Sequence, residues 1–87
     1  MSKGREFTSE EARHIGDQIG VDWDSVPLEE FRVGLRVELE HGSRDPQTNV
    51  TDDDPLVTGK IALAHLKEFS DYYTRLTRME AEAEGKL

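Results

Sequence analysis

The sequence predicts an all-α protein, a compact bundle of three to four short helices with a long ordered acidic loop between helices 2 and 3. Apolar residues recur three and four positions apart in several segments, which is the period of a helix with one buried face. Helix-capping residues, glycines and prolines separate those segments, and no segment alternates apolar and polar residues as a strand does. We expect one helical domain over residues 1–87, with an ordered core at about residues 7–82.

The first helix is predicted from its capping residues. Thr8 and Glu11 have the spacing of a capping box, Phe7 and Ala12 can form the hydrophobic staple, and Gly20 follows the last apolar residue. Trp23 lies in the connector at 20–26, and we expect its indole N–H to reach a carboxylate or carbonyl at the end of a small core.

The second helix is expected from Pro27 or Leu28 to His41, and Gly42 is expected to end it. Its main apolar stripe comprises Leu28, Phe31, Leu35 and Leu39. Val33 and Val37 lie on the opposite side, so this helix has two apolar faces. Two apolar faces are typical of a helix at the centre of a bundle or at an intermolecular contact.

The loop at 42–54 precedes a third helix that begins with Asp54 as cap and Pro55 at its first position. The expected buried stripe of this helix comprises Thr58, Ile61, Ala62, His65 and Phe69. Ser70 and Asp71 indicate a break and a new cap. A fourth helix follows, with Tyr72, Leu76, Met79 and Ala83 at helical spacing.

Two histidine–glutamate pairs stand in mirror image on the second and third helices, as Glu38-x-x-His41 and His65-x-x-Glu68. Residues three apart lie on one side of a helix, so both members of a pair can point the same way. Imidazole and carboxylate groups on facing helices are how bundles bind iron, manganese or zinc. Glu38, His41, His65 and Glu68 are therefore the candidate ligands of Fe, Mn or Zn.

Two other interpretations of these residues stay open. His65 can be a core histidine that bonds Glu38 across the helix pair, because a buried glutamate without a partner is costly. His41, beside Gly42, can simply favour the negative end of a helix. Apart from metal binding and these structural roles, the remaining interpretation is catalytic proton transfer by the same four residues.

The acidic loop has hard oxygen ligands that suit calcium, at Asp45, Asn49, Asp52 and Asp53. Their spacing differs from that of an EF-hand loop, and the central glycine of such a loop is absent. The alternative is that the aspartates at 52–54 cap the third helix and stay solvated.

Composition restricts the function classes. The net charge of −8 is spread evenly, with 6 basic and 10 acidic side chains in residues 1–44 and 5 and 9 in residues 45–87. Without a basic stripe, nucleic acid is not an expected partner. There is no cysteine, signal-peptide pattern or membrane-length apolar stretch, so we expect a soluble, cytoplasmic protein without a thiol nucleophile. No serine or threonine lies in a recognisable nucleophile elbow, and dinucleotide and phosphate-loop patterns are absent.

The block at 37–76 resembles a family of small domains of unknown function found in bacteria and their phages. The stretches LEHG, DPQTNVTDDDP and KIALAHLKEF carry the resemblance, which extends back to FTSEEARHIGDQIGVDW. Ser70 stands where the family pattern has proline, which loosens the helix break and changes nothing chemical. The resemblance implies an intracellular bacterial or phage accessory protein and assigns no activity to any residue.

The function expected from the sequence is therefore a non-enzymatic binding module. Its partner would be a protein, including a second copy of itself, bound through the acidic loop-bearing face or the second face of the second helix. The alternatives are a metal-binding protein built on the Glu/His pairs, and a phage product that blocks a host protein through its negative surface.

Overall fold

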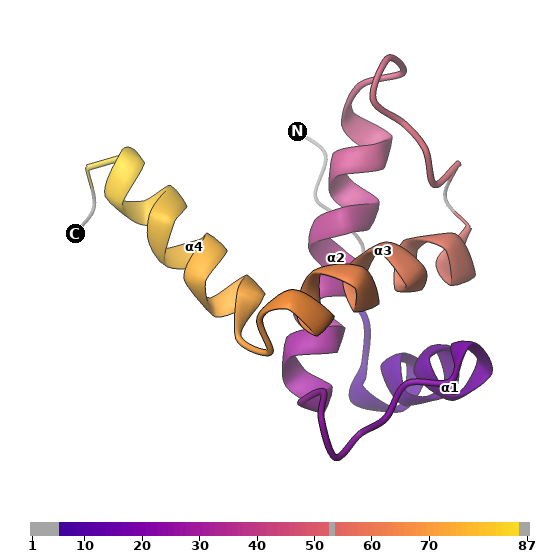
Figure 1. The fold of residues 1–87 in the computed structure, drawn as a ribbon. Helices are drawn as coiled ribbons and strands as arrows, with labels where there is room; N and C mark the ends of the chain where they lie inside the picture. Colours follow the sequence, from indigo (N-terminus) through magenta and orange to yellow (C-terminus); the bar gives the residue numbers. More distant parts are fainter. Residues whose placement is uncertain (1–5, 53, 86–87) are drawn as a thin grey trace.

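The computed structural model describes residues 6–52 and 54–85, which form four α-helices and, within these ranges, no strand. The helices are α1 (Ser9–Ile19), α2 (Leu28–Arg44), α3 (Pro55–Glu68) and α4 (Tyr72–Ala83). α2 runs through the middle of the molecule, α1 and α3 cross it, and α4 projects away from the other three helices (Figure 1). The prediction of a compact all-α fold is confirmed.

The local signals at the helix starts act as predicted. The Glu11 N–H donates to the Thr8 hydroxyl at 3.0 Å, and the Thr8 N–H donates to the Glu11 carboxylate at 2.9 Å, which completes the capping box. Gly20 ends α1 in the left-handed region, with φ of 81°. Asp54 caps α3, and Pro55 occupies its first position. These ends are set by neighbours in the sequence and need no tertiary contact.

The core lies between α2 and the two helices that cross it. Phe31 and Leu35 of α2 have no exposed surface, and Ala12 of α1 and Ala62 of α3 are equally buried. Trp23 closes this core as predicted, with its indole N–H donating to the Asp17 carboxylate at 2.8 Å. The core therefore fixes the positions of the first three helices.

The predicted end of α2 was wrong, because the helix continues through Gly42 to Arg44. Gly42 is buried against the loop: a Cβ atom at this position would lie 2.5 Å from the Thr51 hydroxyl oxygen. The Asn49 side chain accepts hydrogen bonds from the N–H groups of Thr51 and Asp52 and so holds the loop at this point. Gly42 thus allows close packing of the returning loop and does not stop the helix.

The buried faces of the last two helices also differ from the prediction. Phe69 is 52% exposed, and Leu66, which was not predicted as a core residue, is buried in its place. On α4 the buried residue is Tyr73, whereas Met79 is 57% exposed. The break between α3 and α4 was predicted correctly, but it directs α4 outward (Figure 1), so α4 contributes to the core only from its first half, through Tyr72, Tyr73 and Leu76.

None of the helices in the described ranges has the length and apolar character needed to cross a bilayer.

Candidate functional site

Glu38 of α2 and His65 of α3 come together between the two helices, as the helix pattern predicted, with Glu38 buried and His65 half-buried. The His65 Nδ1 atom lies 3.1 Å from the Glu38 Oε2 atom, and Glu38 is only 9% exposed. Burial of a carboxylate is costly unless donors surround it. The imidazole supplies one such donor.

Tyr73 of α4 supplies the second donor. Its hydroxyl donates to the Glu38 Oε2 atom at 2.7 Å, and its oxygen lies 3.1 Å from His65 Nδ1. Because the tyrosine proton is directed at Glu38, the Nδ1 atom must carry a proton to make favourable contacts with these two oxygens. Tyr72 stacks flat on His65, with ring centroids 4.3 Å apart. We call Glu38, His65, Tyr72 and Tyr73 the Glu38 cluster.

The Tyr73 hydroxyl is kept protonated by its surroundings. Burial raises the pKa of this phenol well above its usual value, and the hydrogen bond to Glu38 and the negative charge of that carboxylate raise the pKa further. Tyr73 therefore acts as a fixed hydrogen-bond donor rather than as a base. Within the described residues, no buried side-chain nitrogen or oxygen lacks a hydrogen-bond partner.

A second glutamate of α2 holds the start of α4. The Glu30 carboxylate accepts hydrogen bonds from the N–H groups of Tyr73 at 3.0 Å and Thr74 at 3.3 Å, and from the Thr74 hydroxyl. Asp71 occupies the N-cap position but makes no side-chain cap bond, and it pairs with Arg75 at 2.8 Å. A carboxylate from another helix thus caps α4, where the helix dipole favours negative charge.

Gly34 lets the Tyr73 ring approach α2. A Cβ atom at position 34 would lie 2.5 Å from the Tyr73 Cε2 atom, so only glycine leaves room for the ring. Glu30, Gly34 and Glu38 follow one another at intervals of four and so form one face of α2. The contact of Glu30 with α4 was not predicted from the sequence, although this acid–glycine–acid spacing was visible.

The other two predicted metal ligands lie apart from the Glu38 cluster. His41 is exposed on α2 and lines a groove beside α4, and Glu68 is exposed at the end of α3. In residues 6–52 and 54–85, no group of three or more histidine, aspartate or glutamate side chains is placed to hold a metal ion. The structure brings together Glu38 and His65 alone, and the four-residue ligand set stays a prediction from the sequence.

The predicted calcium ligands serve the loop itself. The Asp45 carboxylate accepts from the Gln47 N–H at 2.9 Å, and the Asn49 side chain accepts from the Asp52 N–H at 2.8 Å. These are local turns closed by Asx side chains. Asp52 has a positive φ of 49° and is exposed, and Asp53 lies outside the described residues.

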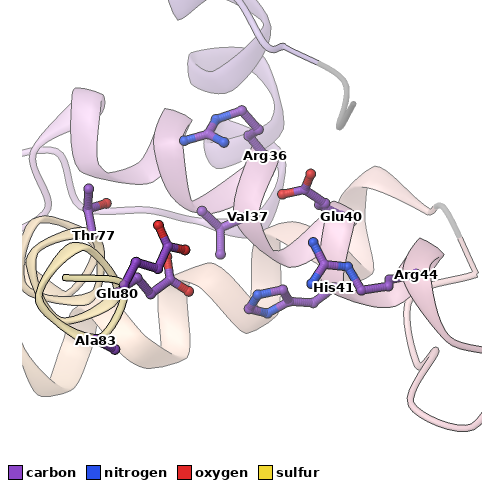
Figure 2. Close-up of a pocket in the computed structure, with 9 residues that line it drawn as sticks. Arg36, Val37, Glu40, His41, Arg44, Thr77, Glu80 and Ala83 are labelled. Atoms are coloured by element: carbon purple, nitrogen blue, oxygen red, sulfur yellow. The ribbon is translucent and has the colours of Figure 1, made fainter. Parts of the chain in front are cut away.

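A groove of about 370 Å³ separates the C-terminal half of α2 from α4. We call it the α2–α4 groove. Figure 2 shows Val37 pointing into it, with Arg36 and His41 on either side and Glu80 on the opposite wall. Its lining consists of Arg36, Val37, Glu40, His41, Arg44, Thr77, Glu80, Ala83 and Glu84. The α2 wall carries both arginines and one acidic residue, Glu40, whereas the charges of the α4 wall are all acidic.

The two sites differ in what they can do. The Glu38 cluster is internally satisfied and joins α2, α3 and α4, so its role in this arrangement is to position α4. The α2–α4 groove exists because α4 is held at its first turn and then diverges from α2. It offers charged side chains of both signs around Val37 and Ala83.

Comparison with known proteins agrees with the resemblance seen in the sequence. No curated protein and no solved structure matches the chain. A family model, by contrast, matches residues 12–82, which include all the residues of the Glu38 cluster. The chain therefore belongs to the family described as protein of unknown function (DUF5661).

Proposed function

We propose that this domain is a non-enzymatic protein-binding module and that its docking surface is the α2–α4 groove. The observation that carries the proposal is the open space between the two helices, lined on one side by the second face of α2. Val37 belongs to that face, and a helix with two apolar faces suits a helix that binds on both sides.

The charges of the walls define the partner's chemistry. Arg36, Glu40 and Arg44 stand on α2, Glu80 stands on α4, and Glu84 is the C-cap of α4. A helical segment of a partner protein fits if it presents acidic side chains to α2, basic side chains to α4, and a small apolar strip to Val37 and Ala83. Complementary charges of this kind mainly give specificity and a faster association rate.

The Glu38 cluster supports a binding role over a catalytic one. A catalytic acid or base must present its proton or lone pair to a substrate. Here the Tyr73 hydroxyl donates its proton to the Glu38 carboxylate at 2.7 Å, and Glu38 is buried. Neither group is therefore presented to a substrate. The cluster instead sets the position of α4, and α4 in turn forms one wall of the α2–α4 groove.

The test is site-specific photo-crosslinking in the cells that produce the protein, with a benzophenone amino acid at position 83. The expected result is one discrete crosslinked protein whose linked peptide carries both acidic and basic residues. The double charge reversal Arg36→Glu with Arg44→Glu should abolish this product, because it places like charges opposite the acidic flank of the partner.

The matched control is the same crosslinker at position 60, which is exposed on α3 away from the α2–α4 groove lining, together with the charge reversal Lys60→Glu. The crosslinker at position 60 should not give the product seen at position 83, and Lys60→Glu should not change the yield of that product. The same crosslinked proteins at both positions, or a product that persists in the double arginine variant, would contradict the proposal.

A further inference from the structure

The side of α4 that faces away from the α2–α4 groove forms a second surface. Four residues of α4 are spaced by three, one and three positions and therefore lie along one stripe of the helix. They are Arg75, Arg78, Met79 and Glu82. All four are exposed, and none belongs to the groove lining. We call this stripe the outer face of α4.

The outer face continues onto the break before α4. The Arg75 guanidinium lies 5.3 Å from the centre of the Phe69 ring, and Met79 is one turn further along the helix. Phe69 and Met79 are both more than half exposed. Two large apolar side chains and three charges thus form one connected surface on a helix that projects from the body (Figure 1).

The charges of this surface are ordered along the helix. Arg75 and Arg78 come before Met79, and Glu82 comes after it. A second copy of α4 lying antiparallel, with the two-fold axis between Arg78 and Met79, places each Arg75 opposite Glu82 of the other copy. It also brings the two Met79 side chains together on one side of the axis and the two Arg78 side chains together on the other, where each Arg78 has Glu82 of its own chain as a partner. A parallel arrangement would place Arg75 opposite Arg75, so the order of charges selects the antiparallel one.

We propose that the outer face of α4 is a self-complementary surface that pairs two copies of this chain in an antiparallel, two-fold arrangement. The surface is isologous, as closed dimers require, because the same patch is used on both copies. It is independent of the α2–α4 groove, which stays open on the other side of each α4.

The pairing must compete with contacts inside one chain. Arg75 already lies 2.8 Å from Asp71, and Arg78 lies 3.9 Å from Glu82. Water screens exposed pairs of this kind, so an arginine can exchange or share its partner at little cost. Since one short helix face is well below the usual size of a stable interface, we expect a weak dimer with a Kd of roughly 10⁻⁴ M.

The test is sedimentation equilibrium of the full chain at low salt, from micromolar to millimolar concentration. The native protein should shift from the mass of one chain towards the mass of two. Arg75→Glu and Glu82→Arg should each weaken association at least about tenfold, because each places two like-charge pairs in the dimer. Lys60→Glu makes the same change in net charge as Arg75→Glu but lies on α3, and it should leave association unchanged.

Two experiments that should restore dimerisation make the test specific to the proposed register. The double variant Arg75→Glu with Glu82→Arg should dimerise again, and an equimolar mixture of the two single variants should form a mixed dimer. Helicity measured by circular dichroism shows whether each variant retains α4. A native chain of single mass at millimolar concentration, a mixture that fails to associate, or a dimer lost in Arg36→Glu but kept in Arg75→Glu would overturn the proposal.

Discussion

At the scale of single residues, Tyr73 determines how α4 joins the rest of the protein. Its ring packs on Gly34, its N–H donates to Glu30, and its hydroxyl donates to Glu38. Apolar packing, a backbone hydrogen bond and a side-chain hydrogen bond therefore depend on one residue that is 1% exposed. The adjacent Tyr72 stacks its ring on His65 and meets the Tyr73 ring edge-on, with centroids 4.9 Å apart.

Tyr73→Phe should destabilise the protein by about 1–3 kcal/mol, because it removes a donor from a buried carboxylate while keeping the ring. Urea unfolding followed by circular dichroism measures the change. Tyr72→Phe is the matched control, since the Tyr72 hydroxyl makes no hydrogen bond within the described residues and its loss should cost less than about 0.5 kcal/mol. Equal losses in the two variants would contradict the role assigned to the Tyr73 hydroxyl.

Alkaline pH should weaken the fold through the same group. The folded pKa of Tyr73 is raised by burial and by Glu38, so above about pH 10 the unfolded chain gives up this proton while the folded chain keeps it. The free energy of unfolding should then fall as pH rises above about 10, and more steeply in the native protein than in Tyr73→Phe. Identical slopes in a series of urea titrations would show that Tyr73 is not protected.

Gly34→Ala should destabilise the protein although alanine favours helices by about 1 kcal/mol over glycine. The added methyl would lie 2.5 Å from the Tyr73 ring, and overpacking of this kind costs about 1–3 kcal/mol. Thermal unfolding measures the change. If the Gly34→Ala protein has an unchanged or higher melting temperature, Tyr73 does not pack against Gly34 in solution.

At the scale of the elements, the starts of α1 and α3 could be predicted because their causes are local. The side chains of Thr8 and Asp54 accept from the first N–H groups of these helices, and Pro55 has no N–H to satisfy. The role of Gly42 was predicted wrongly because it depends on a tertiary contact: Thr51 of the returning loop packs against this glycine. The meeting of Glu38 and His65 was predictable, since each residue lies on a largely apolar helix face and needs a polar partner there.

The face of α4 could be predicted from its own periodicity only in part. Tyr72 and Leu76 of the predicted stripe pack against the core, but Met79 is exposed, and the buried residue is Tyr73. The helical pattern predicts that the whole length of α4 packs on the core, whereas in the structure α4 is anchored at its first turn. Glu30, on another helix, determines that anchor.

Glu30→Gln should loosen α4 and leave the other helices unchanged. The amide keeps one oxygen acceptor but loses the negative charge at the positive end of the helix, and we expect a loss of about 1 kcal/mol. Hydrogen exchange should become faster at the first N–H groups of α4, those of Tyr73 and Thr74 in particular. Asp71→Asn is the control, because Asp71 makes no cap bond and should change these rates little. Faster exchange in the control than in Glu30→Gln would contradict the assigned cap.

At the scale of the whole molecule, three crossed helices form the body and α4 forms an arm (Figure 1). The helix count and the acidic loop could be predicted from the sequence, but the direction of α4, and with it the α2–α4 groove, could not. That direction depends on Glu30 and Glu38 reaching across from α2. The functions proposed for both surfaces depend on the direction of α4. One side of α4 lines the α2–α4 groove, and the opposite side is the outer face of α4.

The most direct test of this account is a nuclear Overhauser measurement on the full chain in solution. The Tyr73 ring should give strong cross-peaks to the Gly34 α-protons, and the Tyr73 hydroxyl proton should exchange slowly because it donates to the buried Glu38 carboxylate. A Tyr73 ring that shows no cross-peak to α2, with a hydroxyl proton in rapid exchange with water, would contradict the account.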